Sequence, residues 1–149
     1  PYWAESDERI TQMPESVRRF LAHSRPFEFR PVQWPEFAGP KPSAPLKQVW
    51  FRAVDHVPSD ELWMHRCLLA YVSDYNLFDV ALRPHGIPII RLQLASIDHA
   101  MWFHRPARVD EWLLYSVDSP SASGARGFSR GGTQTRAIDG GATRGGHPQ

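Results

Sequence analysis

The sequence predicts an α+β domain in which an antiparallel sheet wraps around one long central helix, and two observations carry this prediction. The first is a run between Pro58 and Pro84 that suits a helix and is apolar over most of its circumference. A helix of this kind is usually enclosed by the rest of its domain. The second is a series of segments in which apolar residues alternate with period two, as they do in half-buried strands.

The strand candidates are short stretches rich in aromatic and β-branched residues. In chain order they cover residues 27–32, 48–53, 91–104, 111–118 and, with a weaker pattern, 123–131. The central helix is expected over residues 59–82, because Ser59 can cap its first turn and Arg83, Pro84 and Gly86 stop the run. A shorter amphipathic helix is expected at residues 15–23.

The length and composition predict one domain with a linker before it and a tail after it. A chain of 149 residues that is 42% hydrophobic can build one core but not two. We expect a linker with a short helix over 1–24, the domain over 25–130, and a glycine-rich, disordered tail over 131–149 that supplies no buried strand. The first residue is Pro rather than Met, so a fragment or a processed chain is expected.

The charge and cysteine content exclude several classes of protein. The formal net charge is +1 and the basic residues are scattered, so nucleic acid is not an expected partner. No run of 18 apolar residues is present, so no membrane partner is expected. Cys67 is the single cysteine, which excludes an internal disulfide, and its apolar neighbours predict a small buried side chain. Nothing in the sequence points to export, so we expect a cytoplasmic protein.

Asp74 is the main candidate for a functional residue, because it lies in the middle of the predicted helix among apolar side chains. Counting about 100° per residue places Trp63, Cys67 and Tyr71 on its side of the helix. An ionised carboxylate in such surroundings costs free energy unless it has donors or a chemical task. Two interpretations stay open: a structural Asp satisfied by a buried donor, or a catalytic carboxylate.

The densest chemistry lies in the segment ASIDHAMWFHRP, which follows the predicted helix. If this segment is a strand, Ser96 and His99 point to opposite faces, which disfavours a hydrolase triad. His99 and His104 also point to opposite faces, which disfavours a zinc site. Ser96 can instead face the helix as a hydroxyl partner for Asp74. Asp98 and His99 are expected to form a hydrogen-bonded pair that fixes a strand or a turn.

Several ordered blocks of the sequence resemble the type II acyl-CoA thioesterases, the TesB-like family. The blocks are QVWFRA at 48–53, LLAYVSD at 68–74, ASIDHAMWFHRP at 95–106, EWLLY at 111–115 and SPSASGARG at 119–127. Together they cover roughly residues 16–130. The resemblance implies a hot-dog fold, an antiparallel sheet wrapped around a long central helix, and the position of the C-terminal half in a double hot dog.

The resemblance also implies a reaction and its residues. Members of this family hydrolyse fatty acyl-CoA to free fatty acid and CoA, using an Asp, a Thr or Ser, and a Gln that hold and activate a water. Asp74 matches the first of these and Ser96 the second. The implied partners are the acyl-CoA substrate and either a second copy or a second hot-dog domain. No metal and no organic cofactor are implied.

The sequence departs from the family pattern at its C-terminal end. The family places its Gln on a final strand with a Gln-Glu-Gly motif, and here the glycine-rich tail stands in its place. A shifted reading frame after about Gly131 would produce such a tail. We assign the role of this Gln to neither Gln134 nor Gln149. The departure favours an alternative: a non-catalytic or partner-dependent hot-dog fragment that has lost the final Gln-bearing strand.

Two further expectations follow from the resemblance. A hot-dog hydratase acting on enoyl-CoA would need an Asp-His pair on the helix, whereas His65 lies on the far side of the helix from Asp74. This class is therefore the least favoured. Without a second hot-dog domain the fold would expose a sheet edge and apolar helix surface, so we expect self-association or marginal stability.

Overall fold

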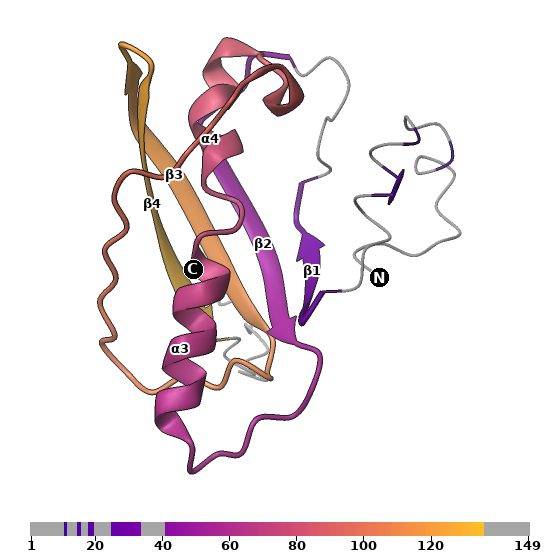
Figure 1. Ribbon diagram of the computed structural model, residues 1–149, viewed down its shortest axis with the longest axis vertical. Helices are drawn as coiled ribbons and strands as arrows, with labels where there is room; N and C mark the ends of the chain where they lie inside the picture. The colour runs from indigo at the N-terminus through magenta and orange to yellow at the C-terminus, as the bar shows by residue number, and fades with distance from the viewer. Residues whose placement is uncertain (1–10, 12–14, 16–17, 20–24, 34–40, 136–149) are drawn as a thin grey trace, which may run out of the picture.

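The computed structural model describes residues 11, 15, 18, 19, 25–33 and 41–135. Four strands form one antiparallel sheet in the order β1-β2-β3-β4, and two helices lie across one face of it (Figure 1). The strands are β1 (Phe27–Pro31), β2 (Leu46–Ala53), β3 (Leu113–Ser123) and β4 (Arg126–Thr135). The helices are α3 (Leu62–Ser73) and α4 (Phe78–Leu82), followed by single-turn 3₁₀ helices at Arg83–His85 and Ile89–Arg91. The predicted α+β class with an antiparallel sheet is confirmed.

The alternation of apolar residues in β2 and β3 decides which face of the sheet meets the helices. Val49 pairs with Tyr115 and Phe51 pairs with Leu113, and all four side chains are buried. Residues paired across antiparallel strands share a face, so these side chains form the floor of the core. Trp50 lies between two of them and points to the opposite face.

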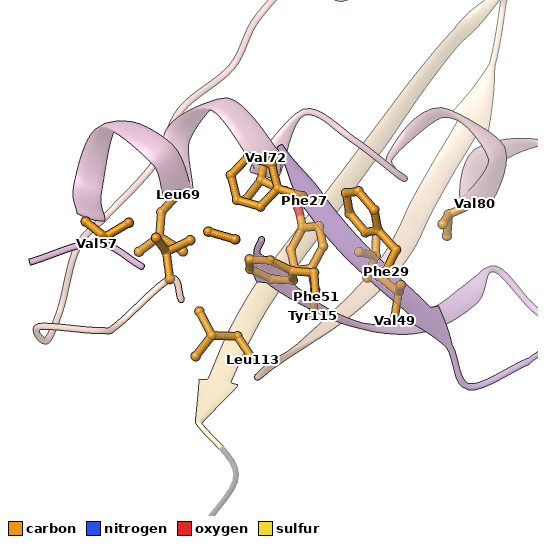
Figure 2. Packing of buried hydrophobic residues seen from close by; sticks show 13 residues of the cluster. Phe27, Phe29, Val49, Phe51, Val57, Leu69, Val72, Val80, Leu113 and Tyr115 are labelled. Carbon is orange, nitrogen blue, oxygen red and sulfur yellow. The ribbon is translucent and has the colours of Figure 1, made fainter. Parts of the chain in front are cut away.

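The core between the sheet and α3 is largely aromatic. Figure 2 shows Phe27, Phe29, Phe51 and Tyr115 gathered under the helix, which contributes Leu69 and Val72 from its lower side. The Phe51 and Tyr115 rings meet edge to face, with centroids 6.3 Å apart. Each fully buried ring of this size stabilises the fold by about 1.5–3 kcal/mol, which fixes α3 on the sheet.

The single long helix predicted over residues 59–82 is wrong, because the structure divides it into α3 and α4. Asn76, between the two helices, adopts a φ of 71°, a left-handed conformation that Asn tolerates better than most residues. The backbone N–H of Tyr75 donates to the Val72 carbonyl at 3.0 Å and closes the last turn of α3. Asp74 therefore lies at the C-terminal end of a helix and not in the middle of one.

The strand predicted over residues 91–104 is also absent from the described part of the chain. Residues 92–104 run past the β4 side of the sheet without joining it (Figure 1). Most of their side chains are exposed, and Ile97 and Trp102 are 85% and 74% exposed. Alternating apolar residues make a segment able to join a sheet, but a strand also needs a neighbour for its backbone hydrogen bonds.

The predicted boundary between domain and tail lies too early, because β4 continues to Thr135. Gly131, the first residue of the predicted tail, and Gly127 before it have packing roles in this strand. A Cβ atom at Gly131 would collide with the Tyr115 ring, and one at Gly127 would lie 2.9 Å from the Ala81 Cβ of α4. Gly127 therefore lets β4 approach α4, and Gly131 leaves room for the Tyr115 ring of β3. Residues 136–149 and most of the helix predicted at 15–23 lie outside the described residues.

Candidate active site

Asp74 and Ser96 lie together at the C-terminal end of α3. Asp74 follows the last residue of the helix, and Ser96 comes from the extended segment 92–104. The Ser96 Oγ donates a hydrogen bond to the Asp74 Oδ1 at 3.1 Å. The predicted contact between these two side chains is therefore confirmed. A hydrogen bond to an ionised acceptor is roughly twice as strong as one between neutral groups.

The surroundings of Asp74 differ from the prediction. Asp74 is exposed, and so are Trp63, Cys67 and Tyr71 on the same side of α3. The sheet covers only the opposite side of the helix, where His65 is 1% exposed. The predictions of an apolar enclosure for Asp74 and of a buried Cys67 are therefore wrong for the described residues. The Asp74 carboxylate is exposed to solvent, and exposed aromatic side chains lie along the same side of α3.

The negative charge of Asp74 acts on two tyrosines beside it. Burial raises the pKa of Tyr115 to about 12, and the Asp74 carboxylate contributes to the same shift. The hydrogen bond with Tyr71 and burial raise the pKa of Tyr75, and Asp74 again adds to the effect. The Tyr115 hydroxyl consequently stays protonated at neutral pH and donates to the Ser73 carbonyl at 3.1 Å.

The structure adds Ser73 and Tyr115 to the residues that the sequence indicated, and it places His99 against Ser73. The Ser73 Oγ lies 2.8 Å from the Ala70 carbonyl and 3.0 Å from the His99 Nε2. The prediction that Ser96 and His99 point to opposite faces is wrong, since both reach the end of α3. The alternation of side chains between two faces does not apply here, because segment 92–104 is not a regular strand. No Asp98–His99 hydrogen bond is present among the described residues. For Tyr115, the alternation of apolar residues in β3 was the one feature of the sequence that could have indicated a buried side chain under the helix.

The remaining candidates lie away from Asp74. The His65 Nδ1 accepts the backbone N–H of Val109 at 3.1 Å on the sheet side of α3, which is a structural role. Gln134 pairs with Leu114, whose side chain lies on the face of the sheet away from the helices. Across the described ranges, the structure contains no group of three His, Cys, Asp or Glu side chains placed to hold a metal ion. None of the helices in this part of the chain has the length and hydropathy needed to span a bilayer.

Comparison with known proteins decides the family of this chain. The sequence model of the acyl-CoA thioesterases matches residues 17–140. The chain belongs to the acyl-CoA thioesterase family. Acyl-coenzyme A thioesterase 8 of Homo sapiens is 36% identical over 118 residues, which make up 79% of this chain and 37% of that protein. Acyl-CoA thioesterase 2 of Haemophilus influenzae is 37% identical over 123 residues, or 80% of this chain and 42% of its own length.

Solved thioesterase structures share the fold. The acyl-CoA thioesterase II TesB2 of Mycobacterium marinum superposes with a TM-score of 0.62 at 41% sequence identity, over 74% of this chain and 44% of that chain. The tesB protein of Mycobacterium avium subspecies paratuberculosis gives a TM-score of 0.59 at 30% identity, over 75% and 42% of the two chains. The predicted hot-dog fold is confirmed. This chain spans less than half the length of the relatives that it matches.

Proposed function

We propose that this chain hydrolyses fatty acyl-CoA to free fatty acid and CoA, with a water molecule held between Asp74 and Ser96. The observation that carries the proposal is the 3.1 Å hydrogen bond between these side chains, which lie 22 positions apart in a thioesterase-family chain. Exposed side chains on the same side of α3 could contact an acyl chain, among them Tyr71 one turn before Asp74 and Trp63 at the far end of the helix. No metal or organic cofactor is required.

The proton positions at the site suit general-base catalysis. Ser96 donates its one hydroxyl proton to Asp74, so the lone pairs of its oxygen remain to accept a hydrogen bond from water. The second carboxylate oxygen of Asp74 accepts the other hydrogen of the same water. As the water oxygen attacks the thioester carbonyl, Asp74 takes the proton, and the C–S bond then breaks to release CoA as the thiol or thiolate.

The test measures CoA release from medium-chain and long-chain acyl-CoA, detected as free thiol. Asp74→Asn should lower kcat by about 10²–10⁴-fold, the range expected for loss of a general base. Ser96→Ala should lower kcat less, because the carboxylate remains. The matched control is Asp98→Asn, which removes an exposed carboxylate near Ser96 that forms no hydrogen bond within the described ranges. Full activity in Asp74→Asn would refute the proposal.

A second candidate is a non-catalytic or partner-dependent fragment that binds acyl-CoA without hydrolysing it. Two observations favour it: Gln134 lies on the sheet face away from Asp74, and Asp74 is exposed. A folded chain that binds acyl-CoA but releases no CoA would support this candidate over the first.

We also propose that the exposed side of α3 and segment 92–104 pack against a second copy or a second hot-dog domain. Trp63, Ile97 and Trp102 are large, apolar and exposed, and the matched relatives are more than twice as long as the shared region. Large apolar side chains that gather on an exposed surface are characteristic of interaction sites. Sedimentation of the chain should show concentration-dependent association that Ile97→Lys weakens. A chain that stays monomeric at every concentration and unfolds in a sharp cooperative melt would contradict both alternatives.

A further inference from the structure

Segment 92–104 is fastened to α3 by two side-chain hydrogen bonds in the described structure. One joins Ser96 to Asp74 and belongs to the proposed reaction; the other joins His99 to Ser73. We propose that His99 is a positioning residue, which holds the segment against the end of α3 so that Ser96 stays within reach of Asp74. This inference rests on the proposed function, because it assigns His99 a part in the same reaction.

The hydrogens at Ser73 fix which atom donates in the contact with His99. The Ser73 hydroxyl has one proton, and it is donated to the Ala70 carbonyl 2.8 Å away. The His99 Nε2, at 3.0 Å, must therefore carry a proton and donate it to the Ser73 oxygen. Both the Nε2–H neutral ring and the imidazolium can make this bond. The contact consequently survives a change in the charge of His99.

The group that receives this hydrogen bond is firmly placed. Ser73 is buried in the last turn of α3, and its carbonyl accepts the Tyr115 hydroxyl from β3. Tyr115 in turn lies against the backbone of β4 at Gly131. His99 is thus tied to a residue that both the helix and the sheet hold, next in sequence to Asp74.

The segment on the other side of the contact has few constraints of its own. Residues 93–104 form no strand pairing in the described structure, and most of their side chains are exposed, although Met101 packs partly against the core. Loss of the His99 contact would leave Ser96 at the end of a loosely held chain. A reacting group displaced by about 1 Å can cost about 10²-fold in rate, so a bond three residues from Ser96 matters to catalysis.

The test is a double-substitution cycle on kcat with medium-chain acyl-CoA. His99→Leu and Ser73→Ala should each lower kcat about tenfold with KM nearly unchanged, and the double variant should be no slower than either one alone. His99→Gln should restore most of the activity, because its side-chain amide can donate to the Ser73 hydroxyl. The matched control is His104→Leu, an exposed His of the same segment with no hydrogen bond to α3 among the described residues. A ¹⁵N spectrum of His99 should show a protonated Nε2.

Several outcomes would overturn the inference. An unchanged kcat in His99→Leu, additive effects of the two substitutions, or no recovery in His99→Gln would each do so. If Asp74→Asn abolishes hydrolysis while His99→Leu leaves it intact, only the role of His99 fails. If the folded wild-type chain releases no CoA, the proposed function fails, and the role assigned to His99 fails with it.

Discussion

Strand β3 and the extended segment 92–104 share a pattern of alternating apolar residues, but only β3 forms a strand in the structure. Both alternate large apolar residues with smaller or polar ones, and both were predicted to be strands. In β3, Leu113, Tyr115 and Val117 are buried, and the strand has a hydrogen-bonded neighbour on each side. In the segment, Ile97 and Trp102 are exposed, and the described residues give it no strand partner.

The difference shows that an alternating pattern predicts which residues can form a strand but not whether a neighbour is present. Strand β3 lies between β2 and β4, so its backbone groups are satisfied by the sheet. Segment 92–104 reaches the rest of the fold mainly through side chains at the end of α3. The candidate site thus lies where a firmly packed helix meets a lightly held segment. This arrangement makes geometry at the site sensitive to single contacts.

The largest effect should come from a change in the packed region. Phe51→Ala removes a buried ring and should lower the free energy of unfolding by about 3–5 kcal/mol. Ile97→Ala removes an apolar side chain from the exposed segment and should change it by no more than about 0.5 kcal/mol. Denaturant-induced unfolding of the two variants measures this contrast. An equally large loss in Ile97→Ala would show that the segment is packed in solution.

The next effect concerns the point where the extended segment leads into β3. The Arg108 guanidinium holds the pKa of Asp110 well below its ordinary value of 3.8, with help from the Val57 N–H at 3.2 Å. A lowered pKa means that the ionised carboxylate stabilises the folded state above about pH 4, and that this contribution is lost as the pH falls further.

Asp110→Asn should therefore lower the free energy of unfolding by about 1.5–3 kcal/mol at pH 7, because it removes a charged acceptor whose side chain is 8% exposed. The same substitution should weaken the fall in stability between pH 4 and more acidic solutions. Thermal melts across this pH range measure both effects. Glu111→Gln is the control, because this largely exposed carboxylate contacts the same Arg108 and should cost at most about 1 kcal/mol. Equal losses in the two variants would argue against a special role for Asp110.

The strands could be predicted from the sequence because their pattern is local. Alternation placed β2 and β3 correctly, and the ordered blocks indicated the hot-dog family. The end of α3 could not be predicted in this way, because the break depends on the backbone conformation of Asn76, which a helical pattern of apolar residues hides. The exposure of Asp74 was missed for a related reason. A helix that is apolar all round can be covered on one side only.

The candidate site was predicted in part. The contact between Asp74 and Ser96 followed from the prediction that Ser96 faces the helix that carries Asp74, and it is present. Ser73 and Tyr115 were missed because their roles depend on contacts distant in sequence, such as the bond between the Tyr115 hydroxyl and the Ser73 carbonyl. Gly131 was assigned to the tail because residues 131–149 are rich in glycine and have almost no large aliphatic side chains. The packing role of Gly131 depends on the Tyr115 ring, which occupies the space that a Cβ at this position would take.

Two adjacent glycines in β4 offer the finest test of the contrast between packed and open regions. A Cβ at Gly131 would collide with the Tyr115 ring, whereas a Cβ at Gly132 would meet nothing within 4 Å. Gly131→Ala should thus lower the free energy of unfolding by about 1–3 kcal/mol through overpacking. Gly132→Ala should be neutral or raise it by up to about 1 kcal/mol, because alanine reduces the freedom of the unfolded chain.

The same pair of substitutions connects β4 to the candidate site. A displaced Tyr115 ring would lose the 3.1 Å hydrogen bond to the Ser73 carbonyl and disturb the residue that His99 contacts. Gly131→Ala should therefore also lower the rate of acyl-CoA hydrolysis, while Gly132→Ala leaves it unchanged. Thermal melts and near-ultraviolet circular dichroism of the tyrosines would follow the structural change. Equal stability and equal hydrolysis rates in the two variants would mean that β4 does not pack on Tyr115 in solution. The proposed connection from β4 through Tyr115 to Ser73 would then be refuted.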